Sequence, residues 1–323
     1  MSGLPRTAPP GPKPAWLRIR LDTGENYRGV RGMVQGLELH TVCQEARCPN
    51  IYECWGDRTA TFMILGDVCT RRCGFCAVAT GRPRTVDQDE PDHVAEAVRH
   101  LDLKHAVITM VDRDDLPDGG AAHVARVIRA VRNRNPACEV EILTSDFRGV
   151  EGPLDVILPE GPVTFSHNIE TVPRLYPTVR PGSRFECSAG LLRRAVRWRG
   201  SAARPLVKTG LMVGLGESRE ELLLTFAALA EAGVEILTIG QYLRPTLDHL
   251  PVARYYPPGE FEELRREALG CGFRHVEAGP LVRSSYHARR HTESAAVAPA
   301  AAPPFSGDGA APGTALDRPS GRP

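Results

Sequence analysis

The sequence predicts an α/β fold, a partial (β/α) barrel of six repeats with extensions at its N- and C-terminal ends. Two observations predict it. Short apolar runs alternate with helical patterns from residue 59 to residue 272, which indicates a parallel sheet with right-handed crossovers, either open or curled into a barrel. Six repeats fit a partial barrel, and a chain of 323 residues, 42% of them hydrophobic, can bury a core of that size.

The strands are predicted at six places, the fourth of which combines two runs: 62–65, 105–110, 138–143, 155–159 with 163–170, 206–214 and 235–243. The helices between them are predicted at 91–101, 121–132, 183–199, from Ser218 onward, and 260–269. Pro91 suits a first helical turn. Ser218 followed by Glu221 is typical of a capping box.

The two ends of the chain fall outside this pattern. Residues 16–58 are predicted to form an N-terminal extension, and residues 273–290 a C-terminal segment. Residues 1–15 are rich in proline, and residues 291–323 consist mainly of Ala, Pro, Gly and Ser. Because neither stretch has enough large apolar side chains to offset the entropy of ordering, both are predicted to be disordered.

Composition limits the classes of function. A formal net charge of +1 provides no basic surface for nucleic acid, so no nucleic-acid partner is expected. The chain has neither a run of about 18 apolar residues nor a signal pattern at its start, so no membrane association or secretion is expected, and the predicted location is cytoplasmic. In that compartment the nine cysteines are better suited to binding metal than to forming disulfides.

Three cysteines follow the first predicted strand in a C-x3-C-x2-C spacing: Cys69, Cys73 and Cys76. Cysteine thiolates are the usual ligands of iron–sulfur clusters, and three of them so close in sequence can reach three corners of one cube. The fourth iron then stays open, as a catalytic metal site requires. A zinc knuckle without its last ligand and a redox-active C-x2-C pair are the alternatives.

A second set of cysteines precedes the first strand in a C-x4-C-x5-C spacing: Cys43, Cys48 and Cys54. Taken alone, this set fits either a second cluster or a structural zinc ion.

The segment CTRRCGFC resembles the signature of the radical S-adenosylmethionine (SAM) superfamily. The resemblance implies a TIM-type partial barrel and a [4Fe–4S] cluster on Cys69, Cys73 and Cys76, whose open iron SAM chelates. Further motifs, across roughly residues 35–290, resemble the lipoyl synthase family: TVCQEARCPNIYECW, VITMVDRDDLPDGGA, HNIETVPRLYPTVRPG, GLMVGLGES, ILTIGQYLRPTLDHLPV and GPLVRSSYHA.

The resemblance to lipoyl synthases implies an auxiliary [4Fe–4S] cluster on Cys43, Cys48 and Cys54, with Ser285 of the RSSY motif as fourth ligand. This cluster would be dismantled to supply two sulfur atoms, inserted at C6 and C8 of a protein-bound octanoyl chain, and one SAM would be consumed for each C–H bond broken. The implied substrates are octanoylated lipoyl-carrier domains, such as those of 2-oxoacid dehydrogenase acyltransferase subunits and the glycine-cleavage H protein. A ferredoxin or flavodoxin would donate electrons, and an iron–sulfur carrier would rebuild the cluster.

The predicted SAM contacts lie at the carboxyl ends of strands, where chemistry gathers in such barrels. Asn168 and Glu170 are two residues apart in a predicted strand, so their side chains are expected to point to the same side. The resemblance to the family implies that both bind SAM. The other predicted contacts, taken from the same motifs, are Asp112, Gly214, Gly216 and Glu217. Lys208 either binds a carboxylate of the substrate or SAM, or is an ordinary exposed lysine.

Three positions depart from the family pattern: Ser145, Ser166 and Thr209. None of them is a predicted cluster ligand, so they affect only details of substrate fit. Two other functions remain open from the residues alone. One is another two-cluster radical SAM enzyme, of the methylthiotransferase type, and the other is a zinc-stabilised binding protein without catalysis.

Overall fold

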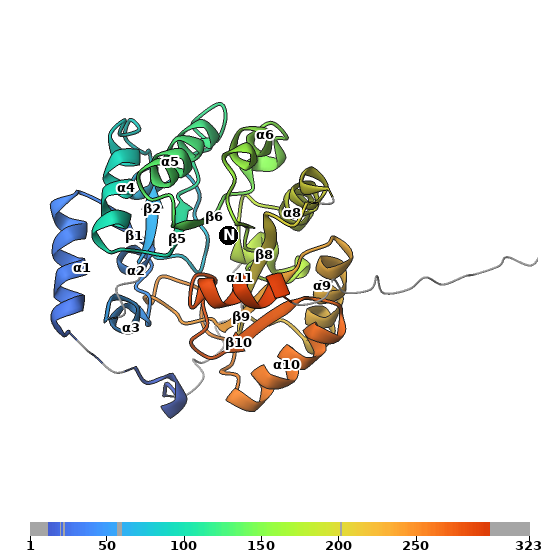
Figure 1. The fold of residues 1–323 in the computed structure, drawn as a ribbon. Helices are drawn as coiled ribbons and strands as arrows, with labels where there is room; N and C mark the ends of the chain where they lie inside the picture. Colours follow the sequence, from blue (N-terminus) through green and yellow to red (C-terminus); the bar gives the residue numbers. More distant parts are fainter. Residues whose placement is uncertain (1–11, 20, 22, 57–59, 201, 298–323) are drawn as a thin grey trace, which may run out of the picture.

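The computed structural model describes residues 12–297 except 20, 22, 57–59 and 201. Its centre is an eight-stranded sheet in which β1 pairs antiparallel with β2 and all later neighbours are parallel. In sheet order the strands are β1 (His40–Thr41), β2 (Thr61–Ile64), β5 (His105–Met110), β6 (Glu139–Leu143), β7 (Thr164–Ser166), β8 (Leu206–Val213), β9 (Ile236–Gln241) and β10 (His275–Gly279). β1 and β10 are the two edges, so the sheet forms the predicted partial barrel (Figure 1).

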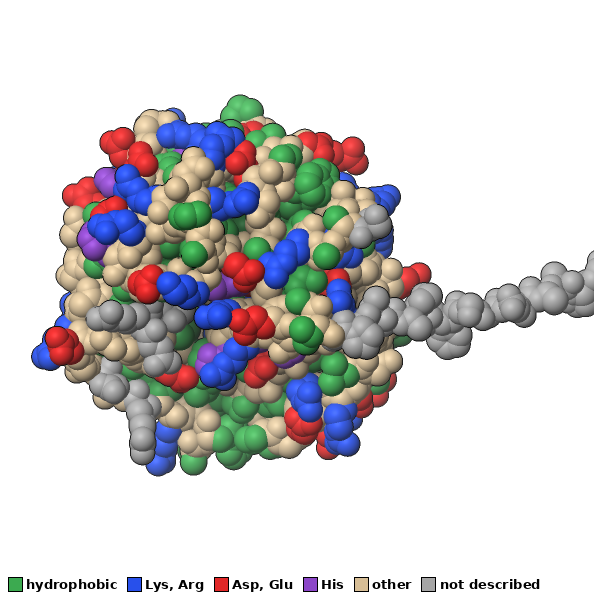
Figure 2. Space-filling model, viewed as in Figure 1, with side chains coloured by type: hydrophobic (Ala, Val, Ile, Leu, Met, Phe, Trp, Pro, Cys, Tyr) green, Lys and Arg blue, Asp and Glu red, His purple; other side chains and the backbone are tan. Residues whose placement is uncertain are grey.

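Helices surround the sheet on its outer face (Figure 1). They are α4 (Glu90–His100), α5 (Ala121–Arg134), α6 (Pro153–Ile157), α8 (Phe185–Arg199), α9 (Arg219–Glu231) and α10 (Pro258–Gly270). Ser218 and Glu221 form the predicted capping box at the start of α9. None of the described helices is both long and apolar enough to cross a membrane. Acidic and basic side chains are mixed over the face seen in Figure 2.

One part of the predicted strand pattern is wrong, because residues 155–159 are helical. They belong to α6 and to the 3₁₀ turn Leu158–Glu160 that follows it. Pro153 occupies the first turn of α6, and Leu154 and Ile157 are buried at the three-residue spacing of a helix face. The fourth strand is therefore β7 alone.

β10 is a strand that the apolar runs did not predict. It extends the parallel sheet beyond the six predicted strands and pairs with β9 from His275 to Gly279. Two alternate residues of β10, His275 and Glu277, are polar, so the strand lacks the apolar run that marks its neighbours.

The prediction of disorder from residue 291 onward is wrong for residues 291–297, which belong to α11 (Ala288–Val297). This helix contacts β5, β8, β9 and β10 and lies across the amino-terminal opening of the barrel (Figure 1). It is held by small buried side chains and by a hydrogen bond of 3.0 Å between the hydroxyls of Thr292 and Thr164. Residues 1–11 and 298–323, the rest of the predicted arm and tail, lie outside the described residues.

The predicted N-terminal extension contains α1 (Glu25–Gly36), α2 (Val42–Glu45) and α3 (Ile51–Gly56). A 3₁₀ turn (Ala15–Leu17) precedes them and begins at the last residue of the predicted disordered arm, so the prediction of disorder is wrong for Ala15. Trp55 of α3 is fully buried, and the ring of Tyr27 of α1 packs against it with centroids 5.2 Å apart. Because α2 follows β1 directly, this aromatic contact and the β1–β2 pairing together fix the cysteine-bearing helices at the barrel edge.

Lys208 is neither exposed nor near the carboxyl ends of the strands. It is fully buried inside the barrel, and its Nζ lies 2.9 Å from Oε1 of the buried Glu141. Ser166 donates to the same oxygen, and His105 lies 3.5 Å from the other. Burial alone would raise the pKa of Glu141. The charge of Lys208 and the nearby His105 outweigh this effect and lower the pKa to about 2. Both alternatives that the sequence left for Lys208 are therefore wrong.

We expect Lys208→Met to lower the free energy of unfolding by about 3–5 kcal/mol, because Glu141 is then buried without its cation. Urea unfolding followed by circular dichroism under anaerobic conditions measures the change. The matched control is Lys104→Met, since Lys104 forms an exposed pair with Asp102; it should leave the midpoint unchanged. Equal midpoints for the two variants would contradict a structural role for the Lys208–Glu141 pair.

Candidate functional site

A cavity of about 680 Å³ lies at the carboxyl ends of the barrel strands. Strand ends, the N-terminal extension and the C-terminal segment all contribute to its wall. The predicted site residues that line it are Cys43, Cys48, Cys69, Cys73, Cys76, Asp112, Asn168, Glu170 and Ser285. The predicted site residues outside its lining are Cys54, Gly214, Gly216 and Glu217.

The cysteine loop, residues 69–76, is fixed by the chain around it. It lies between two short paired strands, β3 (Val68–Cys69) and β4 (Ala79–Thr80). The Thr70 amide donates to the Asp112 carbonyl, 3.0 Å away, at the end of β5. A Cβ on Gly74 would lie 2.8 Å from the Leu250 side chain, so only glycine allows this close contact.

Burial raises the pKa of all three thiols in the cysteine loop, to about 12 for Cys69 and Cys73 and about 11 for Cys76. Binding iron must therefore displace their protons. Three thiolates from one short loop suit an iron–sulfur cluster.

Arg71, inside the cysteine loop, is buried and contacts three carboxylates. It binds both oxygens of Asp114 at 2.7 and 2.8 Å, and lies 2.7 Å from Asp146 and 3.4 Å from Asp112. Burial alone would lower the pKa of Arg71, but these carboxylates outweigh it and hold the pKa above its usual range. Asp112 also lies 3.6 Å from the Cys69 sulfur, and burial raises the pKa of its carboxyl.

Asn168 and Glu170 both line the cavity, and Ile169 between them is fully buried. The predicted strand over 163–170 is too long, however, because β7 ends at Ser166, so both residues lie in the segment after it. Glu170 has a φ of 66°, a left-handed conformation that is uncommon for residues other than glycine and occurs at strained functional sites. Burial raises the pKa of its carboxyl, and the charge of Arg180 opposes this shift. Arg180 follows α7 (Tyr176–Val179) and donates to the Asn168 carbonyl at 2.8 Å.

Gly210 lines the cavity as well, although it was not among the predicted contacts. A Cβ at this position would lie 2.6 Å from Thr238 Oγ1 and 3.0 Å from Asn168 Oδ1. Only glycine therefore lets β8 approach Asn168 so closely. The sequence could have indicated this residue, since Gly210 is the first residue of the motif GLMVGLGES.

Gly214 and Glu217 form the turn that follows β8. The Glu217 carboxylate accepts hydrogen bonds from the Gly214 amide at 2.6 Å and the Tyr256 hydroxyl at 2.9 Å. A Cβ on Gly214 would lie 2.6 Å from the Arg254 carbonyl. In this structure Gly214 and Glu217 stabilise the turn and do not line the cavity themselves.

The second cysteine set lies in the N-terminal extension, with Cys43 in α2 and Cys54 in α3. Burial, with the neighbouring thiol of Cys48, raises the pKa of Cys43 to about 11. Burial, Glu53 and the Cys54 thiol together raise the pKa of the Tyr286 hydroxyl, which belongs to the RSSY motif. Cys54 therefore lies close to the C-terminal segment, although it does not line the cavity.

Two hydrogen bonds join the N-terminal extension to the C-terminal segment. The Asn50 side chain donates to the Leu281 carbonyl at 2.8 Å, and the Tyr286 hydroxyl donates to Glu53 at 2.7 Å. At the end of β9, a Cβ on Gly240 would lie 2.2 Å from the Val282 carbonyl, so glycine lets the C-terminal segment cross the strand end.

This crossing places the RSSY motif at the cavity. Ser285 lines the cavity wall, and the Asn168 side-chain amide donates to the Ser284 hydroxyl at 3.3 Å. Burial lowers the pKa of Arg283, and the nearby thiol of Cys48 opposes the shift. The first cysteine set, Cys43 and Cys48 of the second set, and the first three residues of the RSSY motif therefore line one cavity.

Comparisons with known proteins agree with this arrangement. The sequence model of the radical SAM superfamily matches residues 63–239, and that of the N-terminal domain of lipoyl synthase matches residues 11–48. The lipoyl synthase of Rubrobacter xylanophilus is 56% identical over 283 residues, 88% of this chain and 87% of that protein. The chain belongs to the lipoyl synthase family. The lipoyl synthase of Koribacter versatilis is 53% identical over 88% of this chain and 93% of that protein.

Solved structures support the fold of this lipoyl synthase. Streptococcus suis SuiB bound to its precursor peptide SuiA superposes with a TM-score of 0.53 at 11% sequence identity. The match covers 71% of this chain and 52% of that chain, so this protein spans about half the length of SuiB. At that identity the likeness concerns the fold alone.

Radical SAM enzymes of the lipoyl synthase family use SAM and [4Fe–4S] clusters, and the cavity fits both. The six clustered thiols are the donor type that iron–sulfur clusters prefer. Asn168 and Thr144 line the same cavity, and Asn168 Oδ1 and Thr144 Oγ1 are buried without a hydrogen-bond partner among the described residues. Since buried polar atoms are normally satisfied, these two acceptors suit hydroxyl or ammonium donors of a bound ligand.

We expect Gly210→Ala to weaken SAM binding by about tenfold or more, because the added methyl group displaces Asn168 and Thr238. The Michaelis constant for SAM in a 5′-deoxyadenosine assay measures the effect. Gly190→Ala is the matched control, since a Cβ at that site in α8 meets nothing within 4 Å. An unchanged Michaelis constant in Gly210→Ala would show that this close approach does not matter for SAM.

Proposed function

We propose that this protein inserts two sulfur atoms, at C6 and C8, into an octanoyl chain carried by a lipoyl-carrier domain. The observation that supports this is that Cys69, Cys73 and Cys76 line one cavity together with Cys43, Cys48 and Ser285. A second cysteine set beside the first is what distinguishes sulfur insertion from radical generation alone. The extensions, residues 16–58 and 273–290, are proposed to hold the sulfur source over the barrel, residues 59–272.

Cys69, Cys73 and Cys76 are assigned as ligands of the SAM-binding [4Fe–4S] cluster. When bound, this cluster and SAM supply the radical chemistry that removes hydrogen atoms from the octanoyl chain. The rigid cysteine loop fixes the three thiolates, and Arg71 together with Asp112 sets the charge beside Cys69. Asp112 is also assigned to the SAM pocket, because its carboxylate faces the cavity.

Asn168 and Glu170 are assigned to SAM. Both residues line the cavity from the segment that follows β7 and runs beside Gly210, and the Asn168 oxygen has no hydrogen-bond partner among the described residues. An amide oxygen and a carboxylate can accept hydrogen bonds from ribose hydroxyls or an ammonium group. Gly214, Gly216 and Glu217 support this contact indirectly, through the turn after β8.

Cys43, Cys48, Cys54 and Ser285 are assigned to the auxiliary [4Fe–4S] cluster, which is consumed as the sulfur source and is therefore a substrate. A serine oxygen is a harder ligand than a thiolate and must take up a proton in order to leave iron. The iron at Ser285 is thus the corner where disassembly begins. Arg283, beside Cys48, stabilises the negative charge that accumulates there.

The proposed protein substrates are octanoylated carrier domains of 2-oxoacid dehydrogenase acyltransferase subunits and the glycine-cleavage H protein. A ferredoxin or flavodoxin is the proposed electron donor, and an iron–sulfur carrier rebuilds the auxiliary cluster. Because thiol ligands must stay reduced until iron binds, the proposal includes a reducing compartment such as the cytoplasm. The comparisons favour neither a methylthiotransferase nor a zinc-stabilised binding protein.

We expect Cys43→Ala to cleave SAM but form no lipoyl product, whereas Cys73→Ala loses both activities. The first variant removes only a ligand of the sulfur source, and the second removes a ligand of the radical-generating cluster. An anaerobic assay with an octanoyl-lysine peptide, SAM and reductant measures both products. Cys271→Ala, at the end of α10, is the control and should behave as wild type. Normal lipoyl formation by Cys43→Ala would refute the sacrificial role of the auxiliary cluster.

We expect Ser285→Cys to retain its iron and to cleave SAM, but to form lipoyl product at least about tenfold more slowly. A thiolate holds its iron without the protonation step that releases serine. Iron content by elemental analysis and single-turnover product formation by mass spectrometry measure the two effects. The same substitution at Ser284 tests which serine is the ligand: a larger defect there than at Ser285 would contradict the assignment.

A further inference from the structure

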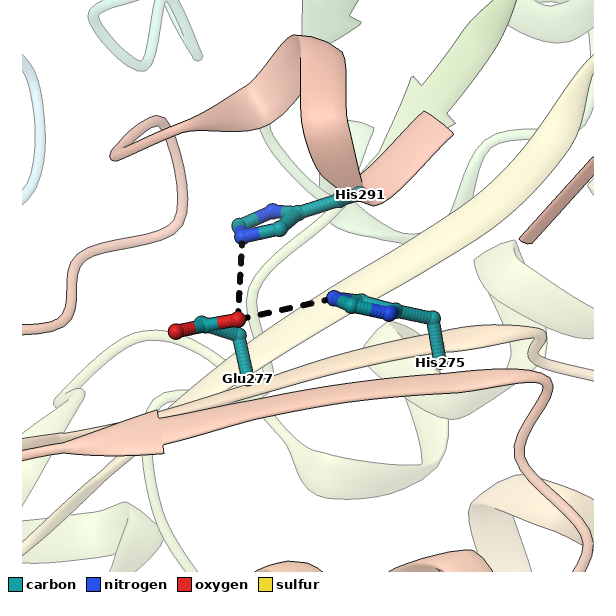
Figure 3. A group of neighbouring side chains, drawn as sticks. All are labelled: His275, Glu277 and His291. Atoms are coloured by element: carbon teal, nitrogen blue, oxygen red, sulfur yellow. Dashed lines mark ion pairs between the residues drawn. The ribbon is translucent and has the colours of Figure 1, made fainter. Parts of the chain in front are cut away.

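The barrel end opposite the cavity holds a second group of metal-binding side chains (Figure 3). His275 and Glu277 are two residues apart on β10 and therefore project from the same face of the sheet. His291 comes from α11, which covers this end of the barrel. Figure 3 shows both imidazole rings directed toward the Glu277 carboxylate.

The three side chains have the spacing of a single-ion site. One ligand atom from each lies within 4.8 Å of the other two, and no other group of three such side chains does so in the described part of the chain. Glu277 Oε2 lies 3.6 Å from His275 Nε2 and 3.9 Å from His291 Nε2. Both distances are too long for hydrogen bonds, but an ion bound at about 2.0–2.2 Å from each atom accounts for them.

The imidazole nitrogens of His275 and His291 that lack hydrogen-bond partners are independent support for a bound metal ion. The His291 side chain is only 1% exposed, and neither of its ring nitrogens has a hydrogen-bond partner within the described part of the chain. His275 Nε2 is also buried and unsatisfied. Because buried polar atoms are normally satisfied, nitrogens in this state need an explanation, and a metal ion is the partner that both Nε2 atoms share with Glu277.

The described residues around His275, Glu277 and His291 leave no uncompensated positive charge beside the group, and they leave it open to solvent, so a cation can enter. The nearest buried cation, Lys208, is already paired with Glu141 at 2.9 Å, so its charge is compensated. The Glu277 side chain is 38% exposed, which leaves a path from solvent and room for water as a further ligand. Two imidazoles and one carboxylate are a donor set that binds zinc, and imidazole favours zinc over the harder ions magnesium and calcium.

We propose that His275, Glu277 and His291 bind one zinc ion that fastens α11 to β10. The helix has ten residues, and its described buried side chains besides His291 are Ala288, Thr292 and Ala295. Such a short helix with small buried side chains gains little from apolar burial, so a metal bridge supplies the attachment that its packing lacks. α11 also begins three residues after Ser285, so the bridge anchors the segment that leads into it.

The test uses full-length, tag-free protein with both [4Fe–4S] clusters assembled anaerobically. The protein is exposed to zinc chloride and desalted, and zinc is then measured by elemental analysis and zinc-edge X-ray absorption. We expect about one zinc per chain with nitrogen and oxygen ligands only. Zinc–sulfur contacts at about 2.3 Å would place the metal at the cysteines and overturn the proposal.

Variants separate the site from general zinc binding. Glu277→Gln keeps the size of the half-exposed side chain and should weaken zinc binding by at least about tenfold in competition with a chelator. His291→Ala should abolish it. His100→Ala, an exposed histidine on α4, is the matched control and should bind zinc as the wild type does.

Thermal unfolding gives a second readout. Zinc should raise the melting temperature of the wild type and of His100→Ala but not that of Glu277→Gln. Without zinc, Glu277→Gln should melt like the wild type, which shows that the variant is folded. Equal zinc affinity in wild type and Glu277→Gln, or an equal zinc-induced shift, would overturn the proposal.

Discussion

The ion pairs of Arg71 are the interaction on which the rest of the cavity depends. Arg71 lies between two cysteines of the loop, yet its carboxylate partners follow β5 and β6. One buried guanidinium therefore ties the cysteine loop to two neighbouring strand ends. Removing it would leave several carboxylates close together and partly buried, which is far more costly than losing an exposed pair. The loop geometry and the local charge are thus set by the same residue.

The N-terminal extension and the C-terminal segment together complete the cavity wall. The N-terminal extension brings Cys43 and Cys48 to it, and the C-terminal segment brings Ser285 across the end of β9 at Gly240. The hydrogen bonds of Asn50 and Tyr286 hold the two ends together. In the barrel itself, the strands position Asp112, Asn168 and Glu170 on the cavity wall, so radical generation and sulfur supply are assigned to different parts of one chain.

The sequence was most informative where the relevant residues are close together or strongly apolar. The six central strands are buried on both faces and appear as apolar runs, and the cysteine loop needs only eight consecutive residues. Residues 155–159 were misassigned because a short apolar run fits a helix face equally well. β10 was missed because the polar residues His275 and Glu277 interrupt its apolar run. α11 was missed because its buried positions carry histidine, threonine and alanine, which composition alone assigns to surface or disorder.

Other residues could not be placed from sequence because their roles depend on distant partners. Nothing local marks Lys208 as buried, since its partner Glu141 lies on another strand, or Arg71 as the centre of a charge cluster. Gly214 and Gly216 resemble ligand-binding glycines by pattern, but Glu217 and Tyr256 complete that turn from within the protein. The sequence pattern was enough to identify the motif GLMVGLGES, but tertiary contacts determine which of its residues line the cavity.

The tether between Asn50 and Leu281, which are 231 positions apart, has a consequence for biosynthesis. During translation the cysteine loop and the N-terminal cysteines leave the ribosome early, long before Ser285. The proposed auxiliary set is therefore complete only once the last strand has docked, whereas the three cysteines of the loop lie within eight residues of one another. In the proposed scheme the auxiliary cluster is thus the last one to be loaded, and each reloading takes place on an already folded chain.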